Sequence, residues 1–319
     1  MAKPRRKRKN RRLLLNVYRD SLGSWPEISP AEELLEYFSD HDLIGWRSRG
    51  KELQAYHYLW FYELESQRAA NQQELIAALR STPGKVVNLD GWGRAMAYKY
   101  SDLPLSYAGS LKWVGGRFNY GADIDESRFA PFPALYLAQD TETGFREMNG
   151  LVREDQRSGL TAEELSLCSR SGIAWVGVEG SVGNIFDVTH VSNLKAVFDV
   201  LSKFKLTRNV RDAEAKLNAK PLRLVKTAKE LQRSLMAENW REFPALFSTP
   251  ANSQLFGHLL SLAGFEGVLY SSTITRRLNL ALFPRQFKNS PSVVRVVNPP
   301  GSARCVELSA SSYTDTEED

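Results

Sequence analysis

Residues 134–147 read ALYLAQDTETGFRE and combine two kinds of local structure. The apolar run at 134–138 has the length of a buried β-strand and follows a proline-rich loop. Asp140 or Thr141 can then cap a helix that carries Glu147. Because a strand followed at once by a helix needs a sheet on which both can pack, this stretch predicts an α+β domain.

The C-terminal third repeats the same mixture of elements. An amphipathic helix is predicted over 253–263, with Gly264 ending it. Two strands follow, at 267–270 and 278–283, on either side of a polar loop. The fold class is therefore predicted as α+β, with a small twisted mixed β-sheet at the core and helices around it.

A glycine-rich segment at 179–183 separates two apolar runs, 174–178 and 184–188. It lacks the residue order of a phosphate-binding loop and does not clearly open a helix. We interpret it as the turn of a β-hairpin.

The N-terminal part has a helical pattern instead. Ser29 precedes Pro30 and two acids in the manner of a helix start, and a longer helix is predicted over about 51–79. Composition and pattern divide the chain into a basic arm at 1–28, a helical module at 29–109, an α+β domain at 110–299 and a flexible tail at 300–319.

The net charge of +5 is concentrated at the N-terminus. Eight of its residues are basic: Lys3, Arg5, Arg6, Lys7, Arg8, Lys9, Arg11 and Arg12. Such a block repels itself and is usually solvated, but it can also bind nucleic acid or an acidic partner through residues 3–12. No aromatic residue is interleaved, so stacking on bases is not predicted.

Other features restrict the class of protein. No run of eighteen apolar residues predicts a membrane span, and no signal-peptide pattern is present. Cys168 and Cys305 are expected to be free thiols in a reducing cytoplasm, although one disulfide between them stays open. The four histidines are scattered without zinc-ligand spacing, so neither a metal nor a cofactor is expected.

Several segments together suggest chemistry. They are Gly116-Arg117-Phe118-Asn119, the run around Tyr136, Glu147 on the following helix, the strand ending in Ser271 and Ser272, and the segment 279–283 that begins with Asn279. Their order and residue types resemble the RES family, which is named for its arginine, glutamate and serine. The resemblance covers about half of the chain.

The resemblance implies a bacterial toxin with an ADP-ribosyltransferase-like fold that degrades NAD+ as substrate and is neutralised by a cognate antitoxin protein. It implies catalytic roles for Arg117, Glu147 and Ser272, with Tyr136 lining the pocket. The remaining matched positions, implied to bind substrate, are Phe118, Asn119, Ser271 and Asn279. Ser271 and Ser272 are alternatives for the family serine, and the alignment favours Ser272.

These residue types suit cleavage of the nicotinamide–ribose bond. A carboxylate stabilises the oxocarbenium-like transition state, an arginine binds the diphosphate, and an aromatic ring supports the nicotinamide. The acceptor of ADP-ribose is predicted to be water or inorganic phosphate. Two alternatives stay open: transfer of ADP-ribose to a macromolecule, and a non-catalytic protein that binds nucleic acid or a partner through the basic arm.

The chain also departs from the family pattern. Typical members are much shorter, so the helical module before Ser110 and the segment between Val188 and Trp240 look like additions. Such additions could cover the pocket, bind an antitoxin, or serve delivery or localisation.

Overall fold

The computed structural model describes residues 40–149, 172–219 and 221–312, and one long strand organises its sheet. This strand, β4 (Ile173–Asp187), is parallel to β5 and antiparallel to β1, β2 and β7. Because β2 pairs with both β3 and β4, strands β2, β3, β6, β5 and β4 form a closed ring of pairings. The bounds of the other strands are β1 (Lys85–Asn88), β2 (Gly93–Ala97), β3 (Leu135–Ala138), β5 (Gly267–Ser271), β6 (Leu278–Leu282), β7 (Val293–Val296) and β8 (Glu307–Leu308).

The predicted strands at 134–138, 267–270 and 278–283 are confirmed as β3, β5 and β6. β6 lies between the other two and is antiparallel to both. The sheet is therefore mixed, with helices around it, as the α+β prediction required.

The prediction of a hairpin at 179–183 is wrong, because β4 runs through the glycines without turning back. Gly180 has φ +121°, and a Cβ on it would lie 2.2 Å from the carbonyl oxygen of Val293 on β7. The glycine thus lets two strands approach closely, which is the other common use of glycine within a strand.

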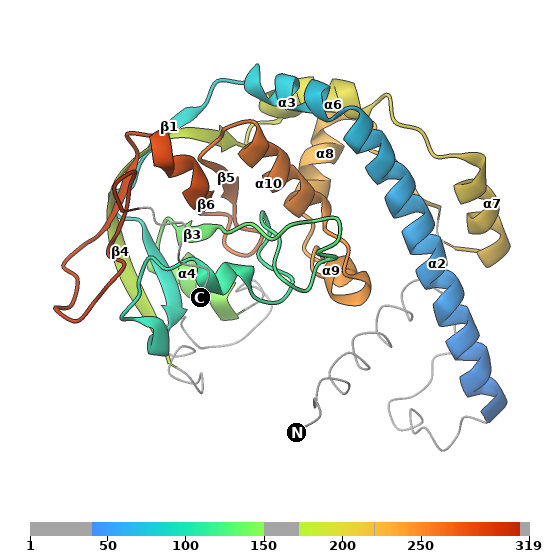
Figure 1. The fold of residues 1–319 in the computed structure, drawn as a ribbon, viewed down its shortest axis with the longest axis horizontal. Coiled ribbons are helices and arrows are strands. Elements are labelled where there is room, and N and C mark those ends of the chain that lie inside the picture. Colours follow the sequence, from blue (N-terminus) through green and yellow to red (C-terminus); the bar gives the residue numbers. More distant parts are fainter. Residues whose placement is uncertain (1–39, 150–171, 220, 313–319) are drawn as a thin grey trace.

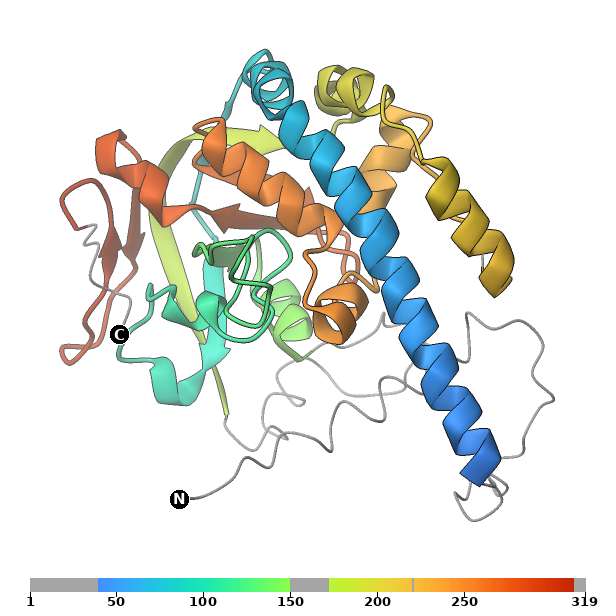
Figure 2. The same cartoon turned by 45° about the vertical axis from the view of Figure 1, so that its right-hand side comes forward.

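The predicted helix over 51–79 is confirmed as two consecutive helices, α2 and α3, separated at Asn71. The predicted helix at 253–263 is α10. Figures 1 and 2 show α2 as a long rod that extends beyond the body of the sheet. The helices are α2 (Asp40–Ala70), α3 (Gln72–Arg80), α4 (Thr141–Asn149), α6 (Lys195–Leu201), α7 (Arg208–Leu217), α8 (Ala228–Leu235), α9 (Glu242–Phe247) and α10 (Asn252–Leu262).

Short 3-10 helices complete the set: η4 (Tyr98–Tyr100), η5 (Ala108–Leu111), η7 (Val191–Leu194) and η8 (Pro284–Asn289).

Two hydrophobic clusters hold the domain together. The larger one joins residues of α3, α8 and α10 to the sheet strands, with Phe118, Tyr120 and Phe186 fully buried. The smaller one lies among β1, β4, β6 and β7 and includes Phe287. Burial of this apolar surface is the main source of stability.

The structure refines the expected division of the chain. Strands β1 and β2 lie within the stretch predicted as a helical module at 29–109, yet both pair with β4. At the other end, Leu308 is buried in β8, within the stretch predicted as a tail at 300–319. Periodicity could not reveal either feature, since such short strands are fixed only by their partners.

Some predictions lie outside the described residues. They are the basic arm at 1–28, the helix start at Ser29 and the thiol of Cys168. Cys305 lies in the stretch before β8 and is partly buried. None of the described helices is both long and apolar enough to cross a membrane.

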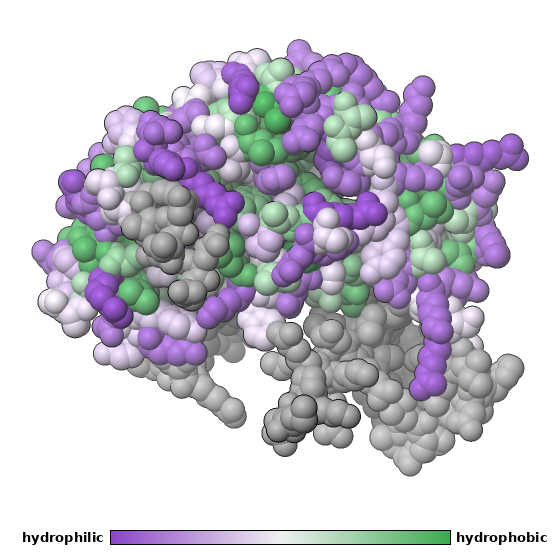
Figure 3. Space-filling view, in the orientation of Figure 1, coloured by the Kyte–Doolittle hydropathy of each residue, from purple (hydrophilic) through white to green (hydrophobic). Residues whose placement is uncertain are grey.

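The surface in Figure 3 shows hydrophobic residues in small areas between hydrophilic ones. Large exposed hydrophobic side chains include Trp113 and Tyr98. Scattered apolar residues of this kind are normal on a protein surface.

An aromatic cage fixes α2 to the helical layer. The ring of His57 lies 4.8 Å from Trp60, 4.9 Å from Phe243 and 4.0 Å from Phe247, measured between centroids. Its Nε2 is 2.8 Å from Oγ1 of Thr249. Burial lowers the pKa of His57 from 6.5 to about 3.

This burial predicts that acid weakens the fold. Below pH 6.5 the unfolded chain protonates His57 while the folded chain does so only near pH 3, so stability falls as pH falls through that window. Within that window, the free energy of unfolding falls by about 1.4 kcal/mol for each pH unit. Urea unfolding at pH 7 and pH 5.5 should show a smaller loss for His57→Phe than for the wild type. His57→Phe leaves the Thr249 hydroxyl unpaired and should be less stable than the wild type at both pH values, so the test compares only the change in stability between them. An equal change in the two proteins would contradict the prediction.

Candidate active site

Helix α4 brings Glu147 to the end of β5. The predicted cap is confirmed, because Oδ1 of Asp140 accepts a hydrogen bond of 2.8 Å from the backbone N–H of Thr143. The hydroxyl of Thr143 lies 2.9 Å from that of Thr275, which ties α4 to the loop after β5. The N-terminal end of the helix that carries Glu147 is therefore fixed to the rest of the domain.

The Glu147 carboxylate is held through one oxygen. Its Oε1 accepts hydrogen bonds from the Ser272 hydroxyl at 2.6 Å and from Nδ2 of Asn279 at 3.0 Å. In the described part of the chain, no hydrogen bond reaches the other oxygen, Oε2. One oxygen is thus oriented by the protein, and the second is available to a ligand.

Ser272, rather than Ser271, faces Glu147. Ser272 is fully buried, and its hydroxyl oxygen also accepts from the backbone N–H groups of Ile274 and Thr275, at 3.1 Å each. The hydroxyl proton is therefore directed to the carboxylate. Ser271 is the last residue of β5 and is paired with Leu278.

Tyr136 on β3 connects this strand to the segment 115–119. Its hydroxyl donates to Oδ1 of Asn119 and accepts from the backbone N–H of Phe118, both at 2.9 Å. Burial raises the pKa of Tyr136, so the phenol stays neutral and keeps both hydrogen bonds.

Asn119 uses all of its amide for the protein. Its Oδ1 accepts from Tyr136 and from the N–H of Gly116 at 2.9 Å, and Nδ2 donates to three carbonyl groups. Because neither atom is left for a ligand, Asn119 shapes the turn in this structure and does not face an open space.

Two glycines make the turn narrow. Gly115 has φ +83°, and a Cβ there would lie 2.5 Å from the backbone nitrogen of Gly121. A Cβ on Gly116 would lie 2.3 Å from the Tyr136 hydroxyl oxygen. The buried amide of Gln254 on α10 donates to three carbonyl groups of the same turn, those of Val114, Gly116 and Asn119, at 2.7, 3.0 and 2.9 Å.

The Arg117 side chain extends from this turn to the chain at the end of α8. Its Nη1 donates to the carbonyl oxygen of Ala237 at 2.8 Å, and its guanidinium carbon lies 5.6 Å from the ring of Trp240. Burial lowers the pKa of Arg117, while the charge of Glu147 raises it. A largely buried guanidinium is thus held near the carboxylate without an ion pair between them.

Tyr270 on β5 is a further buried residue of the candidate site. Its ring lies 4.9 Å from that of Phe118, which is fully buried. Burial and the nearby Glu147 hold the pKa of Tyr270 well above its ordinary value, and the charge of Arg117 acts in the other direction. Arg117, Tyr136, Glu147 and Tyr270 therefore share one electrostatic environment.

The structure thus brings most of the predicted residues together. Glu147, Ser272 and Asn279 are joined directly, and Tyr136 and Arg117 lie beside them. Phe118 and Asn119 support the turn from inside. Sequence analysis missed Gln254, Tyr270 and Trp240. The only signal for Gln254 was a polar residue on an apolar helix face, whereas Tyr270 stood within the motif itself.

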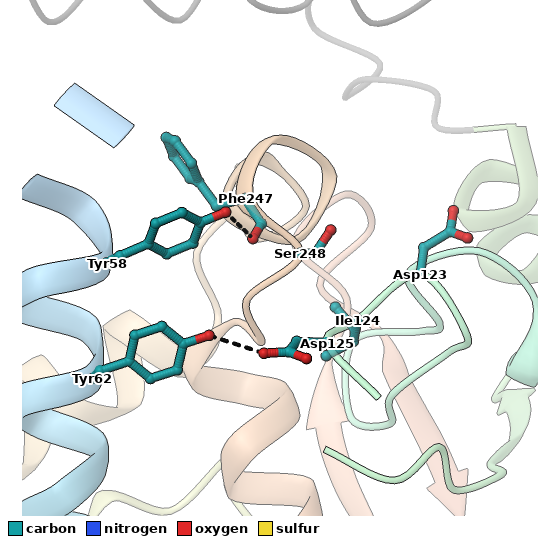
Figure 4. A pocket seen from close by; sticks show the side chains of 7 residues that line it. All are labelled: Tyr58, Tyr62, Asp123, Ile124, Asp125, Phe247 and Ser248. Carbon is teal, nitrogen blue, oxygen red and sulfur yellow. Dashed lines mark hydrogen bonds between the residues drawn. The ribbon is translucent and has the colours of Figure 1, made fainter. Parts of the chain in front are cut away.

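A separate pocket of about 500 Å³ lies beside α2 (Figure 4). Tyr58 and Tyr62 point from α2 toward a loop, where they donate to the Phe247 carbonyl oxygen and to the carboxylate of Asp125, both at 3.1 Å. None of the predicted site residues lines this pocket. The candidate site is therefore defined by its chemistry and not by the size of a cavity.

One comparison identifies the family. The sequence matches the RES domain family over residues 92–302, which is more than half of the chain. This chain therefore belongs to the RES family, as the resemblance implied.

Comparison with individual proteins adds little. None of the curated proteins matches the sequence. Among solved structures, the chain is similar to the crystal structure of the M. tuberculosis MbcT-MbcA toxin-antitoxin complex, with a TM-score of 0.37 and 15% identity. That similarity covers 71% of this chain and 93% of the other.

The contacts of Gln254 predict that this side chain stabilises the turn at 114–119. Gln254→Leu removes the three hydrogen bonds that Gln254 donates to the turn and leaves their carbonyl groups unpaired. We expect the free energy of unfolding to fall by on the order of 2–4 kcal/mol. Urea unfolding measures this, with the exposed Gln73→Leu on α3 as matched control. A Gln254→Leu variant as stable as that control would show that these three hydrogen bonds do not stabilise the fold.

Proposed function

We propose that this RES protein is a toxin that cleaves the nicotinamide–ribose bond of NAD+. The observation that carries the proposal is the Glu147 carboxylate, oriented by Ser272 and Asn279 with its second oxygen available. The neighbouring Arg117 and the aromatic residues Tyr136 and Tyr270 supply the other groups that a dinucleotide requires.

The proposed reaction breaks the bond between ribose C1′ and the nicotinamide nitrogen. The bond electrons leave with the pyridine, which becomes neutral, and positive charge develops on the ribose. Glu147 stabilises this charge through its free oxygen, because an oriented carboxylate need not reorganise during the reaction. Ser272 and Asn279 keep that oxygen directed by occupying the other one.

Arg117 is assigned to the diphosphate of the substrate. A guanidinium whose protein partners are neutral carbonyl groups retains its full positive charge for an anion. Tyr136 is assigned to line the pocket, with its hydroxyl fixed by Asn119 and Phe118. We assign positioning roles to Asn119 and Phe118 themselves.

The acceptor in this proposal is water or inorganic phosphate. Attack by water gives ADP-ribose and releases a proton. Attack by phosphate gives ADP-ribose 1″-phosphate. Transfer to a macromolecule uses the same residues and differs only in which nucleophile reaches the ribose, so it is an outcome of the assay below.

An antitoxin partner also belongs to the proposal, because family resemblance implies that an NAD+-degrading toxin needs neutralisation. The interpretation of residues 3–12 as an arm for nucleic acid or an acidic partner stays a prediction, as does the cytoplasmic location.

The main test uses purified chain and NAD+, with and without phosphate, while nicotinamide release is followed. Glu147→Gln removes the negative charge but keeps the size of the side chain, so we expect release to fall on the order of a hundredfold or more. Glu126→Gln, an exposed carboxylate outside the site, is the control. Unchanged release in Glu147→Gln would refute the assignment, and no release by the wild type would favour macromolecular transfer or a binding protein.

A second test separates the two serines. Ser272→Ala removes the hydroxyl that orients Glu147, so the turnover number should fall on the order of tenfold or more, whereas Ser271→Ala should lose less. Melting curves of both variants control for the lost backbone contacts to Ile274 and Thr275. A larger loss in Ser271→Ala would exchange the two assignments.

A further inference from the structure

A second arginine lies beside Arg117 in the candidate site. The guanidinium carbon of Arg241 lies 4.9 Å from the centroid of the Trp240 ring, and that of Arg117 lies 5.6 Å from a ring of the same side chain. One side chain therefore contacts both guanidinium groups, and the charge of Arg241 acts on Arg117.

Neither arginine is neutralised by the protein. In the part of the chain that the structure describes, Arg117 and Arg241 form no ion pair with a carboxylate. One acid, Glu242, adjoins Arg241 in sequence, but it accepts instead from the Asn239 side chain at 2.9 Å. Two neighbouring cations without a carboxylate partner repel each other, and a bound anion removes that repulsion.

The charge of Arg241 affects two residues of the candidate site, Arg117 and Tyr136. It lowers the pKa of Arg117, which like charge does by disfavouring the protonated form, and it also acts on the Tyr136 phenol. The two side chains differ in exposure: Arg117 is buried, whereas Arg241 is exposed. An anion that touches both would extend from the interior of the site to its edge.

The local structure fixes this arrangement. Trp240 is buried, so its ring is a rigid platform for both guanidinium groups. Arg117 donates to the carbonyl groups of Leu235, the last residue of α8, and of Ala237, in the segment between α8 and α9. This stretch ends the segment that looked like an addition to the family pattern.

We propose that Arg241 is a second diphosphate-binding residue, which acts with Arg117 across Trp240 on the substrate. The inference rests on the proposed function for the identity of the substrate. It gives the segment between α8 and α9 a role in substrate binding: this segment orients the buried arginine and supplies the exposed one.

The test measures the affinity for ADP-ribose by calorimetry and the kinetics of NAD+ cleavage in the same set of variants. Arg241→Ala should weaken ADP-ribose binding on the order of tenfold to a hundredfold, the range for a hydrogen bond between charged groups. It should raise KM for NAD+ while kcat stays near that of the wild type, because the diphosphate is bound equally in substrate and transition state. Arg241→Lys should recover part of the affinity, since it keeps the charge but not the planar fork.

Arg233→Ala, an exposed arginine on α8, is the matched control and should bind ADP-ribose like the wild type. Melting temperatures of all variants show whether Arg241 acts on folding. ADP-ribose binding by Arg241→Ala as tight as that of the wild type would overturn the inference, and so would a lower kcat with unchanged KM or a wild type that does not bind ADP-ribose. If binding depends on Arg241 but the wild type releases no nicotinamide, the diphosphate site stands and the proposed reaction fails.

Discussion

The hydrogen bonds of two buried amides, Asn119 and Gln254, are the constraint on which the candidate site depends. Asn119 joins the N–H of Gly116 to the Tyr136 hydroxyl, and Gln254 binds three carbonyl groups of the same turn. A turn buried this deeply would otherwise leave backbone groups unpaired, at a cost of about 1–3 kcal/mol each. These amides therefore make possible a buried turn from which Arg117 projects.

A second constraint fixes the carboxylate. Strand β5 ends at Ser271, so Ser272 lies where the chain leaves the sheet, and β6 places Asn279 opposite Tyr270. Helix α4, capped by Asp140, then brings Glu147 to both. Helix α4 and the neighbouring strands β5 and β6, which are more than a hundred positions apart in sequence, thus meet at one oxygen atom. Because the remaining oxygen is not held, this geometry can orient a charge without neutralising it.

The segment between α8 and α9 has a different role from the sheet. It contributes neutral carbonyl groups and the Trp240 ring to Arg117, so it supports an arginine without pairing its charge. Within the described residues, the long helix α2 contacts α9, the helix that follows this segment, through the cage around His57. The helical additions are therefore structurally continuous with the site.

Local sequence by itself determined the strands that carry the motifs, the capped helix of Glu147 and the family to which the chain belongs. These features depend on alternation, capping residues and a short ordered set of side chains, all of which are local. The tertiary structure alone decided that β4 crosses the glycines of 179–183, because strand pairing and not glycine content determines whether a chain turns. It also chose Ser272 over Ser271 as the partner of Glu147 and brought Gln254 and Trp240 to the site. Contacts of this kind join residues more than a hundred positions apart, and no local pattern encodes which of many polar side chains will meet.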